Sequence, residues 1–140
     1  LTGAPAAAME LEDGRIVTGK TSDLLGASSA LLLNALKELA GIDHEKHVIS
    51  PNAIHPIQEL KTNYLGSKNP RLHMDETMIA LSISAASNPD ARLALEQIPK
   101  LKGCQAHTSV MLSSVDLLSF RKLGVELTCE PKFEQGKKLQ

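Results

Sequence analysis

Aromatic residues are scarce in this chain: it has no Trp, one Tyr and two Phe among 140 residues. Proteins that bind single-stranded nucleic acid stack bases on aromatic side chains, so this scarcity disfavours that class. Positive charge is not in surplus either, because 15 Lys and Arg stand against 16 Asp and Glu, giving a formal net charge of -1. Duplex nucleic acid and anionic membranes both attract polybasic surfaces. We therefore expect no nucleic acid and no membrane among its partners.

Long apolar runs and secretory features are absent from the sequence as well. The most apolar stretch, around residues 31–33, is far shorter than the roughly 20 residues that span a bilayer. No charged and apolar leader pattern opens the chain. Cys104 and Cys129 are the two cysteines, and so few suit free, buried thiols in a reducing compartment better than a disulfide framework. These features predict a cytoplasmic protein.

Apolar residues are plentiful, at 42% of 140 residues, which is enough for one hydrophobic core. The chain begins with Leu1 instead of Met and continues with small residues and Pro5, so we expect residues 1–8 to be a linker from a preceding region. A single α/β domain is predicted over residues 9–133, followed by a polar tail at 134–140.

Apolar patterning and turn residues predict ten elements in the order β-β-α-β-α-α-α-β-α-β. Asp13-Gly14 predicts a hairpin between strands at 9–12 and 15–19, because this dipeptide suits the positive φ angles of a tight turn. Further strands are expected at 47–50, 105–112 and 125–129. Helices are expected at 24–40, 53–65, 74–86, from Asn88 to before Pro99, and from Ser113 or Ser114 to residue 123.

Strands that alternate with helices pair in parallel through right-handed crossovers. The predicted fold is therefore a three-layer α/β/α sandwich around a mixed sheet, with the N-terminal hairpin adding one antiparallel edge strand.

Three polar segments follow expected strands and open expected helices, at the edge where parallel strands would end. Open α/β sheets bind ligands outside that edge, and helix N-termini offer unpaired N–H groups and a positive dipole end. The sequence therefore predicts a site for a small anionic ligand, a phosphate or a carboxylate. The candidate ligand-binding residues are Gly19, Lys20, Thr21, Ser22, Asn52, Ser113 and Ser114.

Two of these features would also suit an enzyme. Lys20 would stabilise developing negative charge, and His55, in the turn after residues 47–50, would transfer protons. A simpler interpretation stays open for the polar residues: Ser22, Asn52 and Ser113 are residue types that cap helices, and capping alone explains them.

Other motifs are weaker. Residues 14–21 (GRIVTGKT) match the P-loop pattern, and a nucleotide-binding enzyme is the minor alternative. The stretch between the two glycines has the character of a strand, where a P-loop needs an irregular loop. Cys104 and His107 have the spacing of half a zinc site, but no second half follows. We predict no metal and no cofactor.

Several stretches together resemble the C-terminal part of a bacterial family catalogued as domain-of-unknown-function family 1846. They are 13–30 (DGRIVTGKTSDLLGASSA), 31–40 (LLLNALKELA), 69–86 (NPRLHMDETMIALSISAA), 101–109 (LKGCQAHTS) and 120–131 (FRKLGVELTCEP). The resemblance covers about residues 6–133. It implies a C-terminal domain whose partner is the larger N-terminal domain of the same protein, with a site that the two domains could share. The family has no established reaction, so the resemblance supplies no catalytic residues.

The resemblance also implies an architecture similar to cytidine deaminases, with a hairpin first and helices on both faces of the sheet. Zinc deaminases carry His-x-Glu and Pro-Cys-x-x-Cys in their first two helix starts. The corresponding stretches here, 22–29 and 50–55, contain neither ligand set. We therefore expect this architecture without the zinc site, and zinc deaminase and ATP-dependent peptidase activities are disfavoured.

A rival hypothesis belongs to another class: a structural or oligomerisation domain with no site of its own. The expected helix at 24–40 is apolar on nearly all sides, and the one at 74–86 is rich in small residues. Each would bury a face against another domain or against a second copy in a homo-oligomer.

Overall fold

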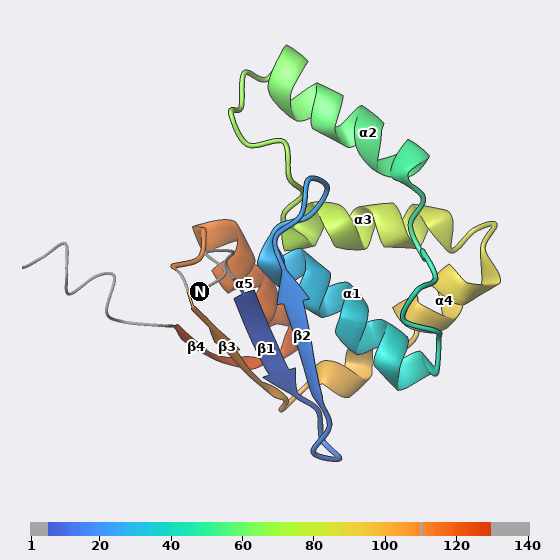
Figure 1. The fold of residues 1–140 in the computed structure, drawn as a ribbon, viewed down its shortest axis with the longest axis vertical. Coiled ribbons are helices and arrows are strands. Elements are labelled where there is room, and N and C mark those ends of the chain that lie inside the picture. The colour runs from blue at the N-terminus through green and yellow to red at the C-terminus, as the bar shows by residue number, and fades with distance from the viewer. Residues whose placement is uncertain (1–5, 110, 130–140) are drawn as a thin grey trace, which may run out of the picture.

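A four-stranded mixed sheet forms one layer of the protein (Figure 1). The computed structural model describes residues 6–109 and 111–129. The strand order is β2-β1-β3-β4, in which β1 is antiparallel to both of its neighbours and β3 is parallel to β4. The strands are β1 (Ala6–Glu10), β2 (Ile16–Lys20), β3 (Gln105–Thr108) and β4 (Glu126–Cys129).

The N-terminal hairpin is confirmed, with Asp13-Gly14 in its turn. Gly14 has a φ of 91°, which glycine adopts without strain. The prediction was wrong about the place of β1, which lies inside the sheet because its second edge pairs with β3. It begins at Ala6, within the stretch expected to be a linker, and Ala7 is buried. The predicted linker residues before Ala6 and the tail at 134–140 lie outside the described residues.

In the described part of the chain, seven helical segments accompany the strands, and several of their predicted ends are confirmed. Asn88 and Ser113 cap their helices through side-chain oxygens, while Gly41 and Gly124 end theirs with left-handed backbones. The segments are α1 (Ala27–Ala40), α2 (Pro51–Glu59) with its π-helical continuation η1 (Leu60–Tyr64), α3 (Met74–Ser84), α4 (Pro89–Leu95), the 3-10 turn η2 (Ile98–Leu101) and α5 (Ser114–Leu123).

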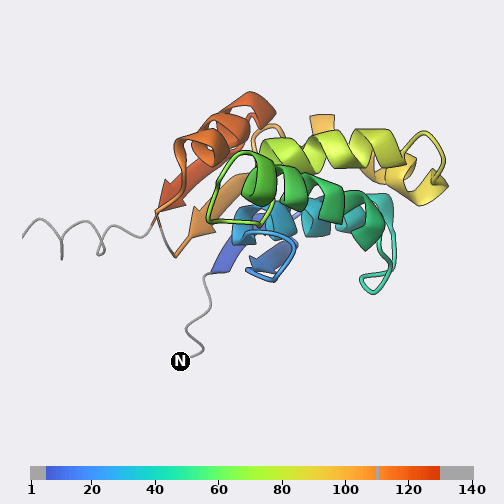
Figure 2. The same ribbon diagram turned by 90° about the horizontal axis from the view of Figure 1, so that it is seen from above.

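The expectation of three layers was wrong, because the described helices cover one face of the sheet (Figure 2). Along β2, Val17 and Gly19 face the helices and are buried. Ile16, Thr18 and Lys20 alternate with them on the opposite face and are exposed, with Ile16 at 61%. The alternation of buried and polar residues is the pattern of a sheet with one wet face. The cytidine-deaminase-like arrangement, with helices on both faces, is not what these residues form.

The predicted strand at 47–50 was also wrong. This segment is an irregular loop, in which Val48 and Ile49 are buried against the core. The loop before it is held by a buried side chain: Lys37 Nζ donates to the carbonyl oxygens of His44 (2.7 Å) and Lys46 (2.6 Å). Burial lowers the pKa of Lys37. An apolar run that is buried without strand pairing looks the same in the sequence as a buried strand.

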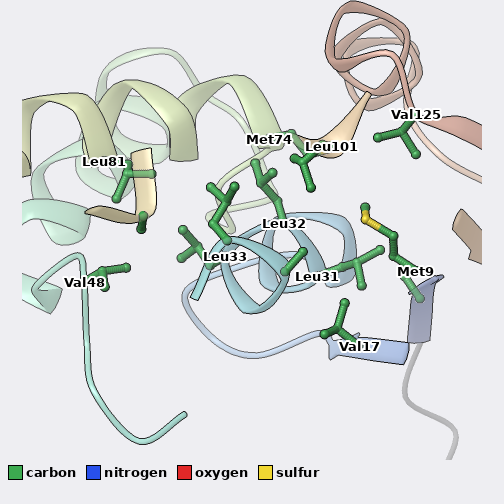
Figure 3. Packing of buried hydrophobic residues seen from close by; sticks show 14 of the residues in the cluster. Met9, Val17, Leu31, Leu32, Leu33, Val48, Met74, Leu81, Leu101 and Val125 are labelled. Carbon is green, nitrogen blue, oxygen red and sulfur yellow. The ribbon is translucent and has the colours of Figure 1, made fainter. Parts of the chain in front are cut away.

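Helix α1 lies at the centre of the core, between the sheet and the other helices (Figure 3). Leu31, Leu32 and Leu36 are completely buried, which explains why this helix is apolar on several sides. The helix packs closely on β2, because a Cβ added at Gly19 would lie 2.3 Å from the Leu31 backbone N. Gly19 is therefore needed for the contact between strand and helix.

Candidate functional site

A cleft lies at the edge of the sheet where β2, β3 and β4 end. These three strands point the same way, because β1 runs antiparallel to β2 and β3 while β3 and β4 are parallel. Helices α1, α3 and α5 all begin beside this cleft, which has a volume of about 300 Å³. Its lining consists of Thr21, Gly26, Ala27, Ser28, Asn69, Arg71, Leu72, His73, Met111, Leu112, Ser113 and Asp116.

The first turn of α1 contributes a buried hydroxyl group to the cleft. Ser28 is only 2% exposed, and its Oγ has no hydrogen-bond partner among the described residues. The residue that precedes the helix, Gly26, has no side chain with which to cap it, and the first turn contains no acidic residue. An unsatisfied buried polar group costs about 1–3 kcal/mol. The N-terminus of α1 thus presents unsatisfied donors to the cleft.

The loop between η1 and α3 brings a cation to the same place. Leu72 N–H donates to Leu24 O (3.0 Å), and Ser29 Oγ donates to Leu72 O (2.9 Å), so the loop is fixed to the start of α1. Arg71 is half-buried, and its Nε donates to Ser22 O (2.6 Å). No ion pair of Arg71 is found in the described part of the chain. Its guanidinium charge is thus not neutralised by a neighbouring carboxylate.

The other two helices at the cleft have acceptors at their starts. Ser113 Oγ accepts from the Asp116 N–H (3.2 Å) in α5, and Asp116 Oδ1 accepts from the Met74 N–H (2.9 Å) in α3. Burial raises the pKa of Asp116 above its usual value, and the charges of Asp75 and Glu76 add to the rise. The Met74 N–H opposes it. Asp116, in the lining of the cleft, therefore ionises less readily than a free aspartate.

This raised pKa makes a prediction for Asp116→Asn. The pKa of Asp116 is higher in the folded protein than in the unfolded chain, so between these two pKa values the unfolded chain loses this proton more readily. The carboxyl group therefore lowers the free energy of unfolding as pH rises through this interval. The amide keeps an acceptor for the Met74 N–H and does not ionise. We expect the variant to be the more stable protein at neutral pH, with the gain shrinking on acidification. Urea unfolding between pH 4 and 7 measures this, and a pH-independent difference would contradict it.

A buried ion pair holds the loop that lines the cleft. Lys61 is 7% exposed, and its Nζ lies 2.8 Å from Glu76 Oε1 and also donates to Arg71 O. Glu76 Oε1 accepts from the His73 N–H as well (2.8 Å). Burial by itself would raise the pKa of Glu76, but the hydrogen bonds from Lys61 and His73 outweigh it and lower the pKa. The pair fixes the loop that carries Arg71.

The structure brings some of the predicted site residues together and separates others. Thr21 and Ser113 line the cleft. Ser22 lies next to it, where its Oγ accepts from the Leu24 and Leu25 N–H groups and its carbonyl from Arg71. Ser114 follows the cap and is exposed.

The remaining candidates lie elsewhere. Lys20 is exposed on the face of the sheet that points away from α1, and Gly19 is buried beneath that helix. Asn52 and His55 are exposed on α2, which stands apart from the sheet in Figure 1. Asn52 and His55 would lie at the cleft only if residues 47–50 formed a strand ending at its edge, and these residues form a loop. The structure thus does not assemble Lys20 and His55 into one catalytic site.

The P-loop alternative does not fit the structure. The residues between Gly14 and Gly19 form β2, whose backbone pairs with β1, where a phosphate-binding loop would need free N–H groups. Gly19 itself packs against α1. Over residues 6–109 and 111–129, no group of three or more His, Cys, Asp or Glu side chains is placed to hold a metal ion. In the same residues, no helix has the length and apolar character needed to cross a membrane.

Sequence reasoning missed Ser28 and Arg71. Ser28 stands in a run of small residues, which is a common feature of closely packed helices, and Arg71 stands in a polar stretch. Their proximity depends on the loop pairing of Leu72 with the start of α1, which links positions more than 40 apart in the sequence. No local pattern signals such a contact, although the missing cap before residue 27 is visible in the sequence as Gly26.

The chain belongs to a family of uncharacterised bacterial domains. Residues 1–139 match the family model described as "Domain of unknown function DUF1846, C-terminal". This confirms the family resemblance and the position of the domain in the family's longer proteins.

Curated relatives agree with this family. The chain is 62% identical to UPF0371 protein CE2832 of Corynebacterium efficiens over 134 residues, which is 96% of this chain and 27% of that protein. It is 58% identical to UPF0371 protein DIP2346 of Corynebacterium diphtheriae over 139 residues, 99% of this chain and 28% of that one. It is 51% identical to UPF0371 protein SUB1165 of Streptococcus uberis over 136 residues, which is 97% of this chain and 28% of that protein. The chain thus spans about a quarter of the length of these relatives.

Proposed function

We propose that this domain binds a small anionic ligand, carrying a phosphate or a carboxylate, in the cleft at the N-terminus of α1. The observation that carries the proposal is the buried Ser28 hydroxyl, which has no hydrogen-bond partner among residues 6–109 and 111–129 and lies next to the uncapped start of a 14-residue helix. A ligand oxygen there would accept from this hydroxyl and from backbone N–H groups at the positive end of the helix dipole. It would satisfy donors that the protein leaves unsatisfied.

Side chains around the cleft support an anion more than a neutral ligand. Arg71 supplies a full positive charge, and the hydroxyls of Thr21 and Ser113 line the same space. Asp116 is the opposing charge, but burial raises its pKa and the Met74 N–H engages one of its oxygens. The cleft is open to solvent, so we also propose that the preceding domain of the full-length protein completes the site.

Thermal unfolding with added inorganic phosphate or acetate, against chloride at equal ionic strength, tests the proposal. An anion at ten times its Kd stabilises by about 1.4 kcal/mol, which for a chain of this size is a Tm shift of about 5 °C. We expect phosphate, acetate or both to raise the Tm of the unmodified chain. We expect Arg71→Gln to lose most of the shift, because it removes the charge and keeps a side chain of similar length.

Ser28→Ala is the sharper variant. Without added anion it should be as stable as the unmodified chain or slightly more so, because the lost hydroxyl had no partner. With the anion it should show a smaller shift than the unmodified chain. Lys20→Gln is the matched control, because Lys20 is a nearby lysine outside the cleft, and it should keep the full shift. A Tm shift that survives in Arg71→Gln and Ser28→Ala but disappears in Lys20→Gln would overturn the placement of the anion in this cleft. If neither anion shifts the Tm of the unmodified chain, the proposal itself is overturned.

A second candidate function, an interaction domain, is favoured by the outer face of α3. Ile79 and Ile83 are 58% and 66% exposed, one helical turn apart, while Thr77, Ala80 and Leu81 face inward. A helix with apolar residues on both sides suits burial on both sides. In this function the domain would assemble with another surface and need no ligand.

A further inference from the structure

The first half of α5 exposes apolar side chains beside the cleft. Met111, on the segment that leads into this helix, is 47% exposed and lines the cleft. Val115, Leu117 and Leu118 in the helix are 38%, 40% and 47% exposed. We call these four residues the α5 apolar patch. Val115 and Leu118 lie about one helical turn apart on the same side of α5, and exposed apolar side chains that form a contiguous surface mark interaction sites.

The chain joins the domain at this same edge. Because β1 runs antiparallel to β2, its first residue, Ala6, pairs with Lys20, the last residue of β2. The Ala6 N–H donates to Ser109 Oγ (3.2 Å), and Ser109 directly follows β3. Ala6 therefore lies where β2 and β3 end, which is the edge that carries the cleft and the start of α5. A domain that precedes Ala6 is tethered beside the α5 apolar patch.

The relatives show how much chain is available to cover the patch. Matched regions make up 27% and 28% of the Corynebacterium efficiens and Corynebacterium diphtheriae proteins, and the family model places them at the C-terminal end. Most of the polypeptide in such proteins therefore precedes this domain. A covalent tether gives that portion a high effective concentration at the edge where it is attached, which a free partner does not have.

We propose that the portion of the full-length protein preceding Ala6 docks on the α5 apolar patch and thereby walls the open side of the cleft. The docking stands on the patch, on the position of Ala6 and on the length of the relatives. The statement that the docked portion walls an anion site rests on the proposed function. The polar face of the sheet, by contrast, has the alternation expected for contact with water.

The test uses the full-length protein that carries this domain and compares two double variants. Met111→Gln with Leu118→Gln makes the patch polar without adding charge. Leu60→Gln with Leu65→Gln is the matched control, because these leucines are at least as exposed and lie in η1 and directly after it, on a surface to which no role is assigned. All four substitutions are at exposed positions, so neither variant removes a core side chain. Small-angle scattering gives the radius of gyration, calorimetry gives the number of unfolding transitions, and light scattering gives the mass.

We expect the patch variant to have a larger radius of gyration than the parent at the same mass and to unfold in two separate transitions. The control should match the parent in compactness and transitions. A patch variant that stays as compact as the parent would overturn the proposal, as would equal expansion in the control. A fall in mass with unchanged protomer compactness would assign the patch to a second copy and also overturn it. None of these readouts depends on an anion, so failure here and failure of the phosphate test are distinguishable.

Discussion

Replacing Gly19 with Ala is expected to destabilise the domain by about 3 kcal/mol or more. A Cβ at this position would lie 2.3 Å from the Leu31 N and 2.7 Å from the Ala27 O, both backbone atoms of α1. Neither atom can move without displacing the helix from β2, and Leu31 and the residues around it form the centre of the core. Urea unfolding followed by far-ultraviolet circular dichroism measures the loss.

Gly26→Ala is the matched control for this change. The nearest atom to an added Cβ there is Leu72 O at 3.8 Å, and the residue has a φ of -69° that any amino acid adopts. Its cost should stay below about 1 kcal/mol. Equal losses in the two variants would show that the close approach at Gly19 does not limit the packing of α1. A near-neutral Gly19→Ala would contradict the described contact between strand and helix.

Removing the buried charge of Lys61 is expected to have the second large effect. In Lys61→Met the aliphatic part of the side chain is kept, while Glu76 and the Arg71 carbonyl lose their shared donor. Breaking a buried ion pair from one side typically costs about 3–5 kcal/mol, and the lower end applies because Glu76 is less deeply buried than Lys61. The loop that carries Arg71 should loosen as well. Urea unfolding gives the loss, and hydrogen exchange of residues 67–73 reports the loop.

The control and the pH dependence make this prediction specific. Lys46 pairs with Asp90 at 2.9 Å on the surface, where water screens the interaction, so Lys46→Met should cost much less stability than Lys61→Met. The pKa of Glu76 is lowered in the folded protein, so its contribution is present above the usual glutamate pKa and is lost as pH falls through the folded value. The gap between the parent and Lys61→Met should therefore narrow under acidic conditions. A cost for Lys61→Met no larger than that for Lys46→Met would contradict a stabilising role of the buried pair.

Much of the local structure was predictable because its causes are local. Asn88 and Ser113 cap helices through contacts with residues two or three positions away. Gly14 and Gly41 adopt backbone angles that their own lack of a side chain permits. The prediction of a strand at 47–50 was wrong because its cause is not local. An apolar segment can be buried in a strand ladder or in a loop, and here Lys37 holds the adjoining loop. That choice depends on a side chain about ten residues away.

The candidate site was predictable in location and only partly in composition. Parallel strands end at one edge of a sheet whatever covers its faces, so Thr21 and Ser113 were placed there by chain direction alone. Arg71 and Ser28 meet because the loop before α3 pairs with the start of α1, a contact that no short-range pattern encodes. Lys20 lies outside the cleft because successive side chains of a strand point to opposite faces of the sheet.

The amino-acid order by itself determined the hairpin, several of the helix ends, the free cysteines and the family. These follow from interactions within a few residues or from similarity along the whole chain. Only the tertiary structure decided that the described helices leave one face of the sheet uncovered, that β1 lies inside the sheet, and that Ser28, in the same cleft as Arg71, has no partner in the described part of the chain. Such features arise from contacts between distant segments, whose free energies compete with one another and are settled only when the whole core packs.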